Sequence, residues 1–207
     1  MQFKEYWDES HKTYSMGKIT YDNWLDKYKD VLDKCKTKVL DLGCGVGNDT
    51  LYLTERGFKV IACDYSEVAL DHLKEQLKDV KIMQLDISQP LPFKENTFDL
   101  IIADLSLHYF DEKTTIEIMK EIRRILKPNG HLLARVNSLQ DKNYGVGNGK
   151  KLEENYYFVE GYNKRFFSIE DAKKFFSYIG KTKIKEADML RYREPKKVIE
   201  VDVERER

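Results

Sequence analysis

Between residues 38 and 136, short apolar segments rich in β-branched residues alternate with segments of helical periodicity. Strands that alternate with helices of about 10 to 15 residues favour right-handed crossovers and a parallel sheet covered on both faces. The fold class is therefore α/β, a doubly wound and mostly parallel sheet. The five predicted strands are residues 38–42, 58–63, 80–85, 98–103 and 131–136.

Helices are predicted between these strands from their capping signals. Asn48 and the two residues after it predict a helix to Arg56, Ser66 can cap a helix to residue 78, and Asp111 begins another. The Lys-Pro-Asn-Gly sequence at 127–130 predicts a turn before the fifth strand. Residues 98–103 form a continuous apolar run, which indicates a central strand buried on both faces.

The remaining segments extend this unit into one predicted domain over residues 1–207. Residues 1–36 are predicted as a helical cap, and residues 138–165 as a long insert with little periodicity, many tyrosines and several glycines. A helix is expected at 168–178. Strands at 182–192 and 197–203 should then form an antiparallel, hairpin-like pair.

Composition excludes several classes of protein. Apolar residues make up 41% of the chain and charged residues 35%, so a globular protein is expected, with the cytoplasm as its compartment and no membrane partner. Lys plus Arg and Asp plus Glu number 36 each, and this neutral balance disfavours nucleic acid as a partner. Three cysteines without a C-x-x-C pair favour neither a disulfide framework nor a metal site.

The candidate chemistry follows the predicted strands. In an open parallel sheet, ligands bind outside the carboxyl ends of the strands. The first strand is followed there by a glycine-rich turn at residues 41–48, which lets a ligand approach backbone N–H groups at a helix N-terminus. Its spacing is G-x-G-x-G. The dinucleotide fingerprint G-x-G-x-x-G, which would indicate a nicotinamide-dependent oxidoreductase, lacks its third glycine because Asn48 stands there.

Two carboxylates follow the next two strands. Asp64, about 20 residues after Gly43, can accept both hydroxyls of a ribose, although a helix N-cap is the alternative. Asp86 can accept an adenine amino hydrogen while the N–H of Ile87 meets a ring nitrogen, although a turn residue is the alternative.

Together these segments resemble the signature of the class I S-adenosylmethionine-dependent methyltransferases. The resemblance covers residues 39–136 and rests on VLDLGCGVGN, VIACDYS, LDIS, FDLIIADLSLHY and RILKPNGHLL, in that order. It implies a seven-stranded sheet with an antiparallel last strand and S-adenosylmethionine as the cofactor. Asp104-Leu105-Ser106-Leu107 lacks the Pro-Pro-aromatic motif of amino-group methylases, so the chain is more similar to the small-molecule branch.

The resemblance also implies roles for particular residues. The turn would hold the methionine half of the cofactor, Asp64 its ribose and Asp86 with Ile87 its adenine edge, beside which Tyr65 would pack. Residues past the fourth strand would lie by the methyl group. The predicted cofactor-binding residues are Asp41, Gly43, Cys44, Gly45, Gly47, Asp64, Tyr65, Asp86, Ile87, Ala103, Asp104 and Leu105.

The acceptor side is less determined. His108 is the candidate catalytic base because it follows the fourth strand, although it could simply pack beside the sheet. His11 in the helical cap could close over the cofactor or lie on the surface, and Arg135 could bind an anionic substrate or form a surface ion pair. The acceptor is predicted to be a small molecule, with RNA, a protein, or a non-catalytic cofactor-binding role as alternatives.

Overall fold

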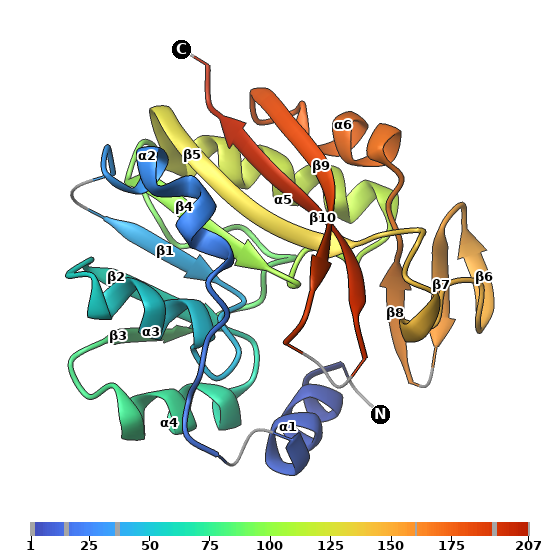
Figure 1. Cartoon of the computed structure of the whole chain (residues 1–207), viewed down its shortest axis with the longest axis horizontal. Coiled ribbons are helices and arrows are strands. Elements are labelled where there is room, and N and C mark those ends of the chain that lie inside the picture. The colour runs from blue at the N-terminus through green and yellow to red at the C-terminus, as the bar shows by residue number, and fades with distance from the viewer. Residues whose placement is uncertain (1–2, 15–16, 36–37, 160, 192–193, 207) are drawn as a thin grey trace.

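The computed structural model describes residues 3–14, 17–35, 38–159, 161–191 and 194–206. Within them, seven strands form one sheet in the order β3-β2-β1-β4-β5-β10-β9 (Figure 1). Their bounds are β1 (Val39–Leu42), β2 (Val60–Asp64), β3 (Lys81–Gln84), β4 (Phe98–Asp104), β5 (Leu126–Asn137), β9 (Lys181–Met189) and β10 (Lys196–Glu204).

The strand directions confirm the predicted sheet. Neighbours among β1 to β5 pair in parallel, whereas the last strand, β10, lies between β5 and β9 and pairs antiparallel with both. Because β9 therefore runs in the same direction as β5, its carboxyl end lies at the edge where the other parallel strands end. This places the connection between β9 and β10 at the ligand edge of the sheet.

Strand β4 is the central strand, as its apolar run predicts. Alternate side chains point to opposite faces of a sheet. Ile101 packs in the cluster formed with α5 and α6, while Leu100 and Ile102 pack in the cluster formed with η1, α2 and α3, and all three are fully buried. The helices are α1 (Phe3–Tyr14), η1 (Trp24–Tyr28), α2 (Lys29–Leu32), α3 (Asn48–Glu55), α4 (Glu67–Gln76), α5 (Glu112–Ile125), η2 (Lys142–Tyr144) and α6 (Ile169–Phe176).

Side-chain caps begin three of these helices. Ser66 accepts the N–H of Ala69 at the start of α4, and Asp111 accepts the N–H of Thr114 at the start of α5. Ser168 forms a capping box at the start of α6. The expected cap at the start of α3 is wrong: Gly47, with φ of 94°, is the N-cap and makes no side-chain bond.

Two further predictions need correction. The 138–165 insert, in which no strand was predicted, contains a three-stranded antiparallel sheet of β6 (Lys150–Glu153), β7 (Tyr156–Val159) and β8 (Tyr162–Arg165). These strands are four residues long, too short for alternation to stand out in the sequence. The turn predicted at 127–130 lies inside β5 as a bulge, since Leu126 already pairs with Phe98 before the register shifts.

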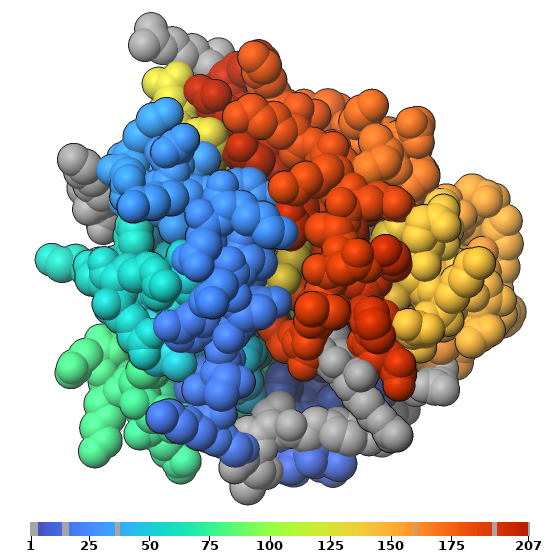
Figure 2. All heavy atoms as spheres, viewed as in Figure 1, coloured from blue at the N-terminus to red at the C-terminus, as the bar shows by residue number. Residues whose placement is uncertain are grey.

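The N-terminal segment crosses the ligand edge of the sheet. The N–H of Ile19 donates to Gln76 of α4, and farther along the chain Lys27 pairs with Glu200 of β10. Figure 2 shows this blue segment beside the red C-terminal strands across the front face. No helix among the described residues is long and apolar enough to cross a membrane.

Candidate cofactor and acceptor pocket

A pocket lies along the carboxyl ends of β1, β2, β3 and β4, where the glycine-rich turn and the predicted carboxylates meet. Ten of the twelve predicted cofactor-binding residues line it: Asp41, Gly43, Cys44, Gly45, Asp64, Tyr65, Asp86, Ile87, Asp104 and Leu105. Gly47 and Ala103 do not. Gly47 packs against α4 instead, because a Cβ there would lie 2.6 Å from Leu73 Cδ1, and Ala103 is fully buried in β4.

The glycine turn needs glycine for two different reasons. Gly43 and Gly45 both have left-handed backbone conformations, with φ of 77° and 52°. A Cβ on Gly43 would lie 2.3 Å from Ser106 Cβ, so close packing excludes any side chain there. On Gly45 the nearest heavy atom would be His11 Cε1, at 3.6 Å. Gly45 is thus the glycine that leaves space on the pocket side for a ligand to approach the backbone.

Asp64 is fixed by two backbone N–H groups. Its Oδ2 accepts from Gly45 at 2.7 Å and its Oδ1 accepts from Ser66 at 2.9 Å. Burial raises the pKa of this carboxyl, against the opposing effect of these hydrogen bonds. Each carboxylate oxygen has a second lone pair. The two acceptor oxygens of Asp64 therefore fit a ligand with two adjacent hydroxyls, such as the ribose of S-adenosylmethionine.

Asp41 and Asp86 have contrasting surroundings at this edge. Asp41 is buried and accepts the hydroxyl of Thr50, and burial raises its pKa to about 7 despite that hydrogen bond. Asp86 accepts both the N–H and the hydroxyl of Ser88 through Oδ1. These bonds hold the Asp86 carboxylate in place at the end of β3, with Ile87 beside it in the pocket.

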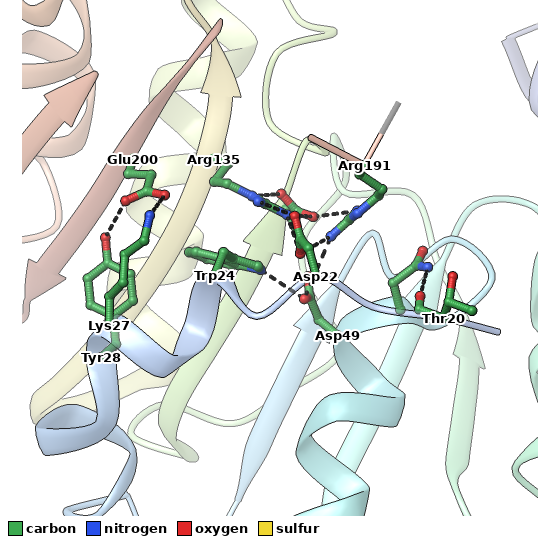
Figure 3. A network of polar contacts seen from close by, with 11 residues as sticks. Thr20, Asp22, Trp24, Lys27, Tyr28, Asp49, Arg135, Arg191 and Glu200 are labelled. Carbon is green, nitrogen blue, oxygen red and sulfur yellow. Dashed lines mark hydrogen bonds and ion pairs between the residues drawn. The ribbon is translucent and has the colours of Figure 1, made fainter. Parts of the chain in front are cut away.

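Arg135, Arg191 and Asp22 belong to a network of charges that joins distant parts of the chain (Figure 3), and Asp104 joins it through both arginines. Arg135 donates to Asp104 through Nε at 2.6 Å and Nη2 at 2.7 Å, and Arg191 Nη1 lies 2.7 Å from Asp104 Oδ2. Both arginines also pair with Asp22. Burial alone would raise the pKa of Asp104, but Arg191 and Arg135 lower it to about 2. Asp104 is therefore a carboxylate at neutral pH and a poor proton acceptor.

The network overturns one of the two alternatives for Arg135, the surface ion pair, because Arg135 is buried. Arg135 is 1% exposed, and its guanidinium carbon lies over the Trp24 ring, 4.5 Å from the ring centroid. Trp24 Nε1 donates in turn to Asp49 Oδ1 in the first turn of α3. Arg135 therefore fastens the N-terminal segment to the ends of β4 and β5.

Arg191 lines the pocket and was not among the predicted site residues. A strand was expected over residues 182–192, which hid Arg191 inside it, whereas β9 ends at Met189. The rule that ligand-binding residues follow parallel strands would have found it, had the strand end been placed correctly.

The two candidate histidines lie in different surroundings. His108 is 2% exposed and does not line the pocket, and burial together with the charges of Lys164 and Lys196 lowers its pKa well below the usual value. This setting does not favour a proton-transfer role, which stays a prediction. His11 of α1 lines the pocket above Gly45, and burial lowers its pKa although Asp64 and Asp8 oppose that effect.

Aromatic side chains complete the pocket beside β4. Trp7 of α1 and Tyr109 and Phe110 after β4 line it, and the rings of Trp7 and Tyr109 meet edge to face with centroids 4.8 Å apart. Helix α1 is also held at the start of α4, where the hydroxyl of Ser66 donates to Asp8 at 2.6 Å. The sequence had pointed to His11 as a residue that could close over the cofactor, but not to Trp7 with Tyr109.

Comparison with known proteins agrees with this geometry. Residues 39–130 match the family model described as "Methyltransferase domain". An uncharacterized methyltransferase of Synechocystis is 37% identical over 93 residues, covering 45% of this chain and 43% of that protein. The tRNA N(3)-methylcytidine methyltransferase Mettl2 of Drosophila melanogaster is 30% identical over 148 residues, covering 65% of this chain and 46% of that protein. The chain spans about half the length of the curated relatives it matches.

Solved structures support the same fold. An S-adenosylmethionine-dependent methyltransferase from Methanosarcina mazei superposes with a TM-score of 0.69 at 17% identity, covering 83% of this chain and 93% of that one. The fold, the motif order and the family match over residues 39–130 together support a class I S-adenosylmethionine-dependent methyltransferase domain in this chain. The cofactor implied by this class is S-adenosylmethionine.

Proposed function

We propose that this protein transfers a methyl group from S-adenosylmethionine to a small-molecule acceptor. The observation that carries the proposal is the position of Asp64. Its carboxylate is fixed by the N–H groups of Gly45 and Ser66 and lines the same pocket as the glycine turn. This arrangement suits the hydroxyls of an adenosine ribose while the backbone at Gly45 leaves space for the rest of the ligand.

The residues of the pocket would act mainly by positioning. When bound, S-adenosylmethionine supplies a methyl group on a positively charged sulfur. Asp64 would bind the ribose, Asp86 and Ile87 the adenine edge, and the glycine turn the methionine half. Asp104, held as a carboxylate by Arg135 and Arg191, keeps a fixed negative charge at the end of β4. Positioned groups of this kind can supply much of the acceleration of an in-line displacement.

The small-molecule acceptor rests on the neutral charge balance and on the aromatic lining of the pocket. The similarity to a tRNA methyltransferase makes RNA the second candidate. RNA binding would depend strongly on salt, because it releases counterions from phosphates. A cytoplasmic location remains a prediction of the sequence.

Calorimetric titration with S-adenosylhomocysteine tests the cofactor assignment. We expect the wild type to bind it and Asp64→Asn to bind at least about tenfold more weakly, since hydrogen bonds to a charged group are lost. Asp71→Asn, an exposed aspartate on α4, is the matched control and should bind like the wild type. No binding to the wild type, together with binding of NADH, would overturn the proposal. Salt-sensitive methylation of transfer RNA would instead replace the small-molecule acceptor.

A further inference from the structure

The pocket has an aromatic wall, defined here as Trp7, Tyr109 and Phe110. Tyr109 and Phe110 follow β4, which lies two strands from β2 and its ribose-binding candidate Asp64. Tyr162 of β8 stands behind the wall, with its ring centroid 5.9 Å from that of Trp7 and 6.0 Å from that of Tyr109. Tyr109 and Phe110 therefore lie at the β4 side of the pocket, and Trp7 of α1 meets Tyr109 there.

The insert holds the backbone of this wall in place. Tyr156 of β7 donates its hydroxyl to the carbonyl of Tyr109 at 3.1 Å. Arg165 of β8 donates its side-chain Nε–H to the carbonyl of Phe110 at 3.2 Å. The backbone N–H of Arg165 donates to the carbonyl of His108 at 2.7 Å. The small sheet thus holds the backbone that carries Tyr109 and Phe110, which is an arrangement suited to a preformed binding surface.

The charge of the pocket selects among possible ligands. Acidic side chains dominate its lining: Asp41, Asp49, Asp64, Asp86 and Asp104. Asp104 is held as a carboxylate by its arginines, whereas burial raises the pKa values of Asp41, Asp49 and Asp64. Among the described lining residues Arg191 is the only Lys or Arg, and it already pairs with Asp22 and Asp104. The faces of aromatic rings carry negative charge density and attract cations. The aromatic rings and the Asp104 carboxylate therefore favour a positively charged ligand, and a lining whose only guanidinium among the described residues is already paired disfavours an anion.

We propose that the aromatic wall binds the methyl acceptor and that this acceptor is a small amine that enters as a cation. The inference rests on the proposed methyltransferase function. Before transfer the ammonium group releases one proton to water, which frees the nitrogen lone pair. The lone pair then forms the new N–C bond, the methyl C–S bond breaks with its electrons staying on sulfur, and the product is again an ammonium.

Three probes of similar shape and different charge test this inference. Phenethylamine, phenethyl alcohol and 3-phenylpropionate are titrated calorimetrically into the protein saturated with S-adenosylhomocysteine. We expect phenethylamine to bind at least about tenfold more tightly than either of the others. Trp7→Leu should weaken phenethylamine binding about tenfold while S-adenosylhomocysteine affinity stays within about threefold.

Tyr178→Leu is the matched control, because Tyr178 is 42% exposed and lies outside the pocket lining. It should bind both ligands like the wild type. If S-adenosylhomocysteine binds but 3-phenylpropionate binds as tightly as phenethylamine, the amine inference alone is overturned. An equal loss of both ligands in Trp7→Leu would assign the wall to the cofactor instead. If the wild type binds no S-adenosylhomocysteine, both the proposed function and this inference are overturned.

Discussion

The two sides of the pocket are built from different parts of the chain. The nucleotide side is the glycine turn with Asp41, Asp64 and Asp86, where the adenosine-containing cofactor is proposed to bind. The acceptor side is the charge network of Asp104, Arg135 and Arg191 with the aromatic wall, where the methyl acceptor is proposed to bind. On the nucleotide side, Asp64 bonds to backbone groups only 19 and 2 residues away. On the acceptor side, Arg191 and Arg135 reach Asp22 across 169 and 113 residues, and Trp7 meets Tyr109. The nucleotide side is therefore organised by one turn and its neighbouring strand and helix. The acceptor side exists only once both ends of the chain have docked.

The carboxylates of the two sides also differ in charge state. Burial raises the pKa values of Asp41 and Asp64 on the nucleotide side. Asp22 is half-buried and the Asp104 side chain is almost fully covered, but Arg135 and Arg191 lower the pKa values of both below the usual range. The comparison shows that burial alone does not set the charge of a carboxylate, because a nearby guanidinium reverses the effect of desolvation.

The largest effect is expected from breaking the charge network with Arg135→Met. This change leaves Asp104 and Asp22 without one of their arginines, so we expect the free energy of unfolding to fall by about 3–5 kcal/mol. Urea denaturation measures it. Lys120→Met removes an exposed pair with Glu117 and should change stability by less than about 0.5 kcal/mol. A loss below about 1 kcal/mol for Arg135→Met would show that the network does not hold the two ends together.

Gly43→Ala tests the local packing of the nucleotide side. The added Cβ would meet Ser106 at 2.3 Å and adopt a left-handed backbone, so we expect a loss of about 2–4 kcal/mol. Gly57→Ala has a similar φ of 82° but nothing within 4 Å, and should cost only about 1–2 kcal/mol. Equal losses in urea denaturation would show that backbone strain alone explains the glycine at position 43.

Asp41→Asn tests the difference in charge state between the two sides. Because the pKa of Asp41 is raised to about 7, the folded protein binds more protons than the unfolded chain between about pH 4 and 7. This contribution to stability is present at low pH and is lost as the pH rises to 7. Between pH 5 and pH 7 the wild type should lose about 1–3 kcal/mol more than Asp41→Asn.

The measurement is urea denaturation of both proteins at the two pH values. Asp104 should not contribute to the difference, since its pKa of about 2 lies below this window. Parallel pH profiles for wild type and Asp41→Asn would contradict the raised pKa.

The smallest effect is expected for Tyr156→Phe on the acceptor side. The variant loses the hydrogen bond to the Tyr109 carbonyl, and we expect the free energy of unfolding to fall by about 0.5–1.5 kcal/mol. Tyr178→Phe removes an exposed hydroxyl and should leave stability unchanged. If the two variants have the same thermal midpoint, the insert does not support the aromatic wall through this bond.

The sequence by itself determined the sheet and the nucleotide side. Its strand and helix signals are local: the apolar run of β4, the caps at Ser66 and Asp111, and the glycines between β1 and α3. Residues that follow parallel strands meet at one edge, so Asp41, Asp64 and Asp86 could be brought together before any contact was known.

Only the tertiary structure decided the acceptor side. The position of Arg191 beside Asp104 and the contact of Trp7 with Tyr109 join segments far apart in the chain. The strands β6, β7 and β8 pair with their neighbours in the chain, but each is only four residues long, too short for alternation to stand out in the sequence. Residue types did not distinguish a surface ion pair from the buried position of Arg135, nor did they show that His108 is buried and does not line the pocket. Burial and charge partners settle such questions, and both arise only when distant segments pack together.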